Sequence, residues 1–283
     1  MTIPAPSGIM NVYTTPDAVK RRLGIVDESH DDVIWHLVNV ASRVVEGICG
    51  RVFYTRRESR KLNVRHRYTV FVDDLVSAES VSEDCDGDGV YERRLGADDY
   101  TLHPMGARPT TPWGRPHFAL KRVLRNGGGY FPLGIRAVEI VGEWGYRKVS
   151  LFIDTYLDNN GGSVTKASRS FKVDDDRHLV PGNTVWVSGE QIFVKSKAAN
   201  VVSVVRGVNE TEARELRDGD QLLRVEYPAE VIEATILLAV NRWRRRDGLA
   251  RTDTTGVDAP REIYDAWEDV RELLKPYMRG VVS

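Results

Sequence analysis

The residues whose types and spacing best suit chemistry form the stretch Asp84-Cys-Asp86-Gly-Asp88-Gly89-Val-Tyr-Glu92. Alternating carboxylates followed by a glycine match the first half of a calcium-binding loop, in which oxygen donors converge while glycine makes the sharp turn. Leu95 stands where an EF-hand has its bidentate glutamate, and the pattern predicts no helix on either side. The candidate metal ligands are Asp84, Asp86, Asp88 and Glu92. Without a metal, the same residues make an aspartate-glycine turn in a hairpin, which is the interpretation that we favour.

A second group is basic and lies where a helix is expected to end. It consists of Arg242, Arg244, Arg245, Arg246 and Arg251. Arginines at the end of a helix favour the negative pole of its dipole and stay solvated, which is one interpretation. In the other, the cluster neutralises phosphates or pairs with carboxylates of a partner. We expect these arginines to serve as an assembly contact rather than to read a DNA sequence.

Patterns that indicate an enzyme are lacking. The sequence contains no Gly-x-Ser-x-Gly, no His-Glu-x-x-His and no phosphate-binding loop that ends in Gly-Lys-Ser/Thr. The six histidines are scattered, and none stands at a helical ligand spacing from another. Two cysteines, Cys49 and Cys85, are too few for a disulfide scaffold or a four-thiolate zinc site. We therefore expect a protein that is not an enzyme and that needs no cofactor, calcium being the one possible ion.

Charge and composition exclude several further classes of protein. The 283 residues include 40 basic and 41 acidic side chains, so the net charge of −1 predicts no overall attraction to nucleic acid or to an anionic membrane. A hydrophobic content of 41% excludes an intrinsically disordered chain. The first sixteen residues lack the pattern of a signal peptide, and the longest apolar run, Val231 to Val240, contains Glu233 and is too short to cross a bilayer. We expect a protein that makes no membrane contact.

Helices are predicted at both ends of the chain. Thr15-Pro16-Asp17 marks the start of a first helix that runs to Leu23 and stops at Gly24. A second helix follows from the spacing of Val33, Ile34, Leu37, Val38, Ala41, Val44, Val45 and Ile48, with Ser29 or Asp31 as its cap and Gly50 at its end. Its other face, with Trp35, His36 and Val40, is unusually apolar, so we expect an oligomer interface there. Pro228 and Pro260 each open a helix near the C-terminus.

The middle of the chain has the period-two pattern of strands, in two blocks. The first runs from Arg51 to Val149 and includes the strand-like segments 68–72 and 137–141. The second runs from about Leu151 to Arg224, with short strands at 184–187, 191–194 and 201–205. The fold class is therefore α+β. We predict a hub of N- and C-terminal helices with a β-rich extension, residues 1–150 plus 225–283, into which a small β-barrel of residues 151–224 is inserted.

Two ends of the sequence carry a family resemblance. The segment Tyr13-Thr-Thr-Pro-Asp-Ala-Val-Lys-Arg-Arg-Leu-Gly-Ile25 precedes a long helix that ends Val45-Glu-Gly-Ile-Cys-Gly-Arg-Val-Phe-Tyr54. This order resembles the head–tail connector, or adaptor, proteins of tailed bacteriophages. Gly142-Glu-Trp-Gly-Tyr146 is similar to the last strand before that family's C-terminal helices, where a proline starts a helix with an arginine-rich end.

The second β block has its own resemblance, to a small β-barrel of several phage neck and tail proteins. The matching segments are Leu179-Val-Pro-Gly182, Ser188-Gly-Glu-Gln191 and Val205-Arg-Gly-Val-Asn-Glu-Thr211. Glu210 stands where glycine is usual in that pattern, and Leu216 where a histidine is common, so the turn is expected to differ locally.

These resemblances imply a structural protein of the virion, located in the neck between capsid and tail and made in the host cytoplasm. Such adaptors form a ring, usually twelve-fold, that docks under the portal protein and extends the DNA channel. The ring is also a platform for the next neck or tail protein, a stopper or tail terminator, while packaged DNA passes without being read. A ring closed by head-to-tail contacts needs two different complementary faces on each chain.

Other classes of function fit less of the sequence. A calcium-binding β module of an adhesion or carbohydrate-binding protein would explain the Asp84 loop and the two β blocks but not the terminal helices. A DNA-binding factor would use Arg242 to Arg251, but dedicated DNA binders are usually basic, and this chain is not.

Overall fold

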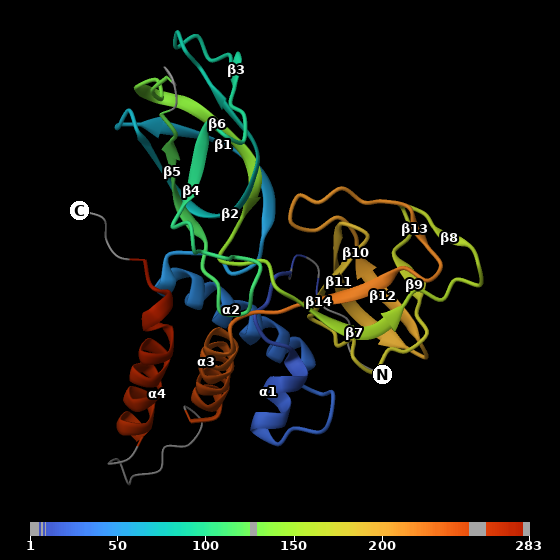
Figure 1. Ribbon diagram of the computed structural model, residues 1–283. Helices are drawn as coiled ribbons and strands as arrows, with labels where there is room; N and C mark the ends of the chain where they lie inside the picture. The colour runs from blue at the N-terminus through green and yellow to red at the C-terminus, as the bar shows by residue number, and fades with distance from the viewer. Residues whose placement is uncertain (1–5, 7, 9, 125–128, 249–258, 280–283) are drawn as a thin grey trace. The chain divides into compact units, whose positions relative to one another are not determined.

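The computed structural model describes residues 6, 8, 10–124, 129–248 and 259–279. Its helices and antiparallel sheets confirm the α+β class (Figure 1). The chain divides into two compact units, which are here called unit 1 (Met1–Arg51 with Ser150–Ser283) and unit 2 (Val52–Val149). Unit 1 thus holds both terminal helical segments together with the second β block. The predicted division into 1–150 plus 225–283 and an inserted barrel of 151–224 stays a prediction.

The two N-terminal helices follow from local signals. Helix α1 spans Pro16–Leu23, with the Thr15 hydroxyl accepting a hydrogen bond from the Ala18 amide and Gly24 left-handed at its end, as predicted. Helix α2 spans Asp31–Cys49 and ends at Gly50 in the left-handed conformation. Its predicted side-chain cap was wrong: His30 holds the cap position without capping. Asp31 is instead the first helical residue, and its carboxylate accepts a hydrogen bond from Lys20 Nζ at 2.6 Å.

The C-terminal helices complete the helical part of unit 1. Helix α3 spans Ala229–Gly248 and helix α4 spans Ala259–Leu274, followed by the 3-10 turn η1 at Lys275–Tyr277. Helix α2 packs mainly against α3, and α3 packs against α4 (Figure 1). The apolar face of α2 is buried there, with Ile34, Val38 and Val45 fully covered. No helix among the described residues has the length and apolar character needed to cross a membrane.

Unit 2 is built on one antiparallel sheet in the order β1-β6-β2-β5-β4, with β3 paired to the far end of β2. Its strands are β1 (Arg56–Val64), β2 (Thr69–Glu83), β3 (Arg93–Arg94), β4 (Tyr100–His103), β5 (His117–Arg122) and β6 (Gly134–Trp144). The 15-residue β2 pairs with β5 near its start and with β6 along the rest. The core packs Leu75, Leu120, Phe131, Ile140 and Trp144 against one another.

Unit 1 holds a second antiparallel sheet in the order β7-β14-β10-β11-β12-β9, and a pair formed by β8 and β13. The strands are β7 (Ser150–Tyr156), β8 (Ser163–Val164), β9 (Ser170–Lys172), β10 (Thr184–Val187), β11 (Glu190–Ala198), β12 (Val201–Val205), β13 (Leu216–Arg217) and β14 (Gln221–Val225). A bridge between Leu157 and Val173 joins the chain just after β7 to the chain just after β9. Buried valines and leucines from nearly every strand form its core.

Candidate functional sites

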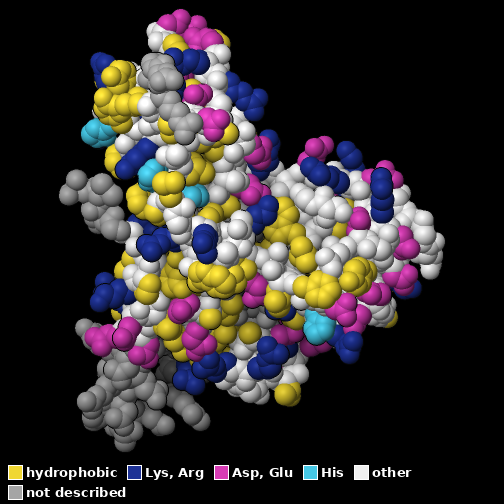
Figure 2. All heavy atoms as spheres, viewed as in Figure 1, with side chains coloured by type: hydrophobic (Ala, Val, Ile, Leu, Met, Phe, Trp, Pro, Cys, Tyr) yellow, Lys and Arg dark blue, Asp and Glu magenta, His cyan; other side chains and the backbone are white. Residues whose placement is uncertain are grey.

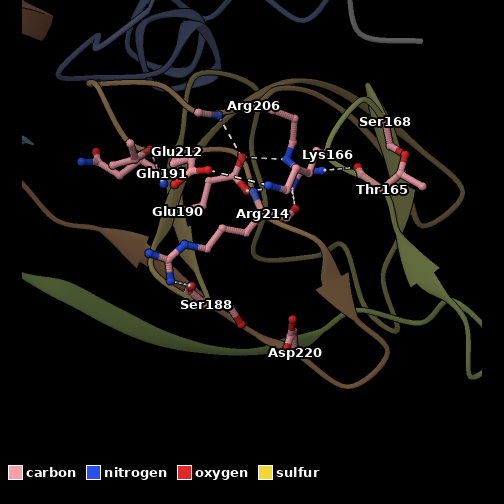
Figure 3. A network of polar contacts seen from close by, with 12 residues as sticks. Thr165, Lys166, Ser168, Ser188, Glu190, Gln191, Arg206, Glu212, Arg214 and Asp220 are labelled. Carbon is pink, nitrogen blue, oxygen red and sulfur yellow. Dashed lines mark hydrogen bonds and ion pairs between the residues drawn. The ribbon is translucent and has the colours of Figure 1, made fainter.

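Glu190 and Arg206 lie at the centre of a buried polar network in unit 1 (Figure 3). Arg206 Nε and Nη2 each donate to one carboxylate oxygen of Glu190 at 2.7 Å. The amides of Gly207 and Arg214 donate to the same carboxylate, at 2.8 and 3.0 Å. Arg206 also donates to the carbonyl oxygens of Thr165 and Arg214. Because the pair is fully hydrogen-bonded and closed to solvent, it organises the loops around it and offers no free group for chemistry.

A second branch of this network starts at Gln191. The backbone amide of Gln191 donates to Thr211 Oγ1 at 3.0 Å, and its side-chain oxygen accepts from Asn209 Nδ2 at 2.8 Å. Asn209 and Asn11 exchange two side-chain hydrogen bonds, of 2.7 and 3.0 Å. The Glu-Gln and Arg-Gly-Val-Asn-Glu-Thr segments noted in the sequence are thus one hydrogen-bonded structure, and it is tied to the N-terminal segment of the chain.

The structure explains the two departures from the expected motif, at Glu210 and Leu216. Asn209 and Glu210 both have left-handed backbones, with φ of 61° and 59°. Glycine takes this conformation without strain, which accounts for a pattern with glycine at the second position. Leu216, where a histidine is common, is fully buried in the core of the second sheet. The departure at Leu216 therefore adds apolar contacts instead of a polar group.

The candidate metal ligands lie in the hairpin loop between β2 and β3. Asp84, Asp86, Asp88 and Glu92 each place one carboxylate oxygen within 4.8 Å of the others. The loop also satisfies these groups by itself. Asp84 accepts from the amides of Gly87 and Gly89 at 2.7 and 2.9 Å, and Asp88 accepts from the Val90 amide at 2.7 Å.

This geometry suits a cation that prefers oxygen ligands, but it does not supply the full set of ligands that calcium needs. Calcium takes six to eight oxygen ligands, and four carboxylates that already cap backbone amides supply only part of that number. The plain aspartate-glycine turn accounts for the hydrogen bonds of Asp84 and Asp88 without an ion.

The arginine cluster lies on the last turns of α3. Arg242, Arg244, Arg245 and Arg246 are all exposed there, and Arg251 lies outside the described residues. The Arg246 guanidinium lies 4.1 Å from the ring centroid of Trp243, and the His30 ring meets the same indole edge-on at 5.1 Å. Trp243 is buried, so these contacts anchor the end of the helix. The other three described arginines of the cluster are exposed on the same turns of the helix.

The expected interface on α2 is only partly exposed. Trp35 is 1% exposed, and a Cβ added to Gly182 would meet its ring at 3.4 Å. Trp35 therefore packs inside its own chain, below the Pro181-Gly182 turn. His36 is exposed and Val40 is half-buried, so the proposal of an intersubunit surface on this helix is kept for these two residues.

One surface was missed in the sequence. At the end of unit 2 where β1 turns into β2, Tyr68, Phe71, Tyr130 and Ile135 are exposed by 46 to 83%. Figure 2 shows hydrophobic side chains gathered beside basic ones over this end of the sheet. The residues come from three separate segments, which hid the cluster, but the sequence holds one clue: no acidic residue occurs between Tyr100 and Val138.

A small cavity of about 160 Å³ lies in unit 1, between the segment from Val12 to Thr15, the start of β10 and the connection from β14 to α3. The two charged residues that line it, Arg224 and Glu226, form an ion pair of 2.7 Å with each other. The Thr14 hydroxyl is buried beside it without a hydrogen-bond partner in the described part of the chain. The lining brings together no catalytic pair.

Neither a protein-family model nor a curated protein matches the chain. Among solved structures, it is similar to one described as the neck of an empty GTA particle computed with C6 symmetry. The TM-score is 0.42 and the identity 10%, over 100% of this chain and 98% of that one. A likeness at this TM-score is too weak to assign a fold or a role to the chain.

Proposed function

We propose that this chain is a subunit of a head–tail connector ring in the neck of a tailed bacteriophage. The observation that carries the proposal is the order of sequence segments that resemble that family. They are the Tyr13–Ile25 helix start, the Val45–Tyr54 helix end, the Gly142–Tyr146 strand and the motifs of the second β block. Its role is structural rather than enzymatic: the ring docks under the portal, extends the DNA channel and carries the next neck or tail protein.

Local structure at these segments supports the proposal. The caps of α1 and the left-handed end of α2 lie where the resemblance puts the helix boundaries. The Glu190, Gln191, Arg206, Asn209 and Thr211 side chains of the motif meet in one network, so the matched residues act together as a unit.

The inserted barrel belongs to the same proposal. The bridge between Leu157 and Val173 supports it, because it brings the two outer strands of the sheet, β7 and β9, next to each other. Closing a sheet on itself removes exposed edge strands, which suits a module at the surface of an assembly.

In the ring, the arginines at the end of α3 supply positive charge for a contact. One chain contributes only a modest charge, but a ring, usually twelve-fold in this family, repeats it in every subunit. The resulting belt pairs with acidic side chains of a portal or with DNA phosphates, without reading bases. The net charge of −1 is compatible with such a belt, because basic and acidic side chains that balance over the whole chain can still lie in separate places.

The test is binding of the purified chain to purified portal rings, followed by native mass spectrometry. The wild-type chain is expected to add a ring of copies to the portal. A variant with Arg242, Arg244, Arg245 and Arg246 all changed to glutamate is expected to stay folded but to lose the ring. Single substitutions should be tolerated, because an exposed ion pair contributes only about 0.2–1 kcal/mol.

A matched control changes four other exposed arginines, Arg21, Arg94, Arg115 and Arg169, to glutamate. This control has the same net charge as the test variant and is expected to bind. Failure of the wild-type chain to bind the portal, or to enter particles, would overturn the proposed function. Normal binding of the quadruple variant would leave the ring in place but remove the arginines from its portal contact.

A calcium-binding adhesion or carbohydrate-binding module remains the alternative, on one observation: the four carboxylates of the β2–β3 loop lie within 4.8 Å of one another. It requires calcium-dependent binding to a glycan, which a glycan array with and without a chelator measures.

A further inference from the structure

The exposed cluster at the end of unit 2 is a defined surface, here called the basic tip: Arg65, Arg67, Tyr68, Phe71, Tyr130 and Ile135. The sheet brings these residues together, because Val64 pairs with Gly134 and Thr69 pairs with Lys121. The Tyr68 and Tyr130 rings meet edge-on at 5.2 Å, and the Arg67 guanidinium lies 5.7 Å from the Tyr130 ring centroid. The tip is therefore a preformed surface and not a set of isolated side chains.

The basic tip exposes several large apolar side chains to solvent, which is unfavourable for an isolated soluble surface. Phe71 is 63% exposed and Ile135 is 83% exposed, and neighbouring Leu133 is 53% exposed. Exposed large apolar side chains gathered in one place mark interaction surfaces, and tyrosine and arginine are the residue types enriched at the energetic centres of protein interfaces. DNA phosphates alone would leave these apolar groups uncovered, so a protein partner fits better.

The positive charge of the basic tip favours a partner with negative charge. Arg65, Arg67, Lys121 and Arg136 are exposed around the apolar groups. The segments that build the tip, 59–72 and 100–138, contain no aspartate or glutamate. A partner surface with exposed carboxylates around apolar side chains is complementary, and a basic partner would be repelled.

Unit 1 of the same chain carries exposed carboxylates and exposed apolar side chains along β7 and the loops beside its end. This surface is here called the acidic margin: Leu151, Phe152, Asp154, Asp174, Asp218 and Asp220. Contacts near the Leu157–Val173 bridge hold three of its aspartates beside the end of β7. The Tyr156 amide donates to Asp174, the Asn159 amide donates to Asp218, and the Leu157 amide donates to the Asp220 carbonyl. Leu151 and Phe152 are 46% and 54% exposed on β7. Within the described residues, none of these four aspartates forms an ion pair shorter than 4 Å.

We propose that the basic tip of one copy docks on the acidic margin of a second copy. The two surfaces differ, so the contact is head-to-tail, and repetition of a head-to-tail contact builds a ring when the rotation closes. The inference rests on the ring of the proposed function and names the contact between its subunits. A second copy is favoured over another protein because this chain itself supplies the complementary charges and apolar groups.

The test is charge reversal followed by rescue, measured by sedimentation equilibrium over a series of protein concentrations. Arg65→Glu with Arg67→Glu is expected to raise the dissociation constant of self-association more than about tenfold, since like charges then face each other. Asp154→Lys with Asp174→Lys is expected to do the same. Mixing the two reversed chains is expected to restore association between them, to within about threefold of the wild type. Arg21→Glu with Arg169→Glu is the matched control and should associate normally.

A second measurement does not depend on the stability of the reversed chains. Arg67→Cys in one copy and Asp154→Cys in another, both with Cys85→Ser, are expected to cross-link through a short bis-maleimide, whereas Arg21→Cys replacing Arg67→Cys should not cross-link. Self-association that is insensitive to the reversals, with no cross-link, overturns this contact but leaves the ring. A wild-type chain that stays monomeric at every concentration overturns the contact too. Only failure to bind the portal or to enter particles counts against the proposed function.

Discussion

Glu190 and Arg206 form an ion pair in which both side chains are closed to solvent and both are fully hydrogen-bonded, with two bonds of 2.7 Å between them. The two residues lie sixteen positions apart in the sequence. The pair fixes the loop from Arg206 to Arg214 against the start of β11, because Glu190 also accepts from two amides of that loop.

Removal of one partner should therefore be costly. Glu190→Gln leaves a buried guanidinium without its counter-charge, and we expect a loss of about 3–5 kcal/mol in the free energy of unfolding. Urea denaturation followed by circular dichroism measures it. Replacement of both residues, Glu190→Leu with Arg206→Met, should recover part of the loss, since the two changes together leave no buried charge unpaired. A single variant as stable as the wild type would contradict this account of the network.

The amide pair of Asn11 and Asn209 should hold the N-terminal segment in place. Asn209→Gly keeps the left-handed backbone but removes three side-chain hydrogen bonds, so we expect about 1–3 kcal/mol of destabilisation. Hydrogen exchange of the amides from Asn11 to Thr14 should rise in the same variant. Asn11→Ala combined with Asn209→Gly should cost less than the two single changes added together, because both remove the same bonds. Additive costs would show that the two residues act independently.

The two cysteines should differ in reactivity. Burial raises the pKa of the Cys49 thiol to about 11, whereas Cys85 is exposed in the β2–β3 loop. Because the thiolate is the reactive form, Cys49 should not react at pH 8. A thiol-specific reagent is expected to modify one cysteine in the native chain and two after denaturation. Cys85→Ser should abolish the native reaction. Rapid modification of Cys49 would mean that helix α2 opens.

The aspartates of the β2–β3 loop should bind calcium only weakly. An ion that binds the folded state raises the melting temperature with its concentration, and we expect no shift on addition of about 1 mM calcium. Backbone amides already occupy both oxygens of Asp84. A calcium-dependent shift that disappears in Asp86→Ala would overturn this expectation and support the metal site.

Stability should fall as the pH drops below neutrality, in part through His117. Burial, helped by the charge of nearby His103, lowers the pKa of His117 below its ordinary value of 6.5. The unfolded chain then takes up a proton before the folded chain does, so the stabilisation is complete above pH 6.5 and is lost as the pH falls toward the lower folded value. Burial raises the pKa of Glu83 above 4.5, which acts in the opposite direction.

The difference between wild type and His117→Gln isolates the histidine. Thermal unfolding between pH 5 and pH 7.5 is expected to show a smaller loss of stability at low pH in the variant. Parallel curves would show that the pKa of His117 is the same in the folded and the unfolded chain.

Much of the local structure was predictable from residues close together in the chain. The limits of α1 follow from Thr15 and Gly24, and the strands at 184–187 and 201–205 were predicted with their observed bounds. Caps and strand periodicity act over a few residues, so they leave their signal in the sequence. The cap of α2 is the exception: Ser29 suited the position by type, but its hydroxyl bonds to Asp27 instead.

What only the tertiary structure decided is which side chains separated in the sequence share an environment. The apolar pattern of α2 could not show that Trp35 lies under Gly182, nearly 150 positions away, and is lost to any interface. Nor could the order of residues in unit 2 show that Arg67, Phe71 and Tyr130 form one exposed surface. The sequence by itself determined the α+β class and the limits of α1, β10 and β12, because these depend on local hydrogen bonds and periodicity. Burial and charge complementarity depend on strand pairing across long loops, which leaves no periodic trace in the chain.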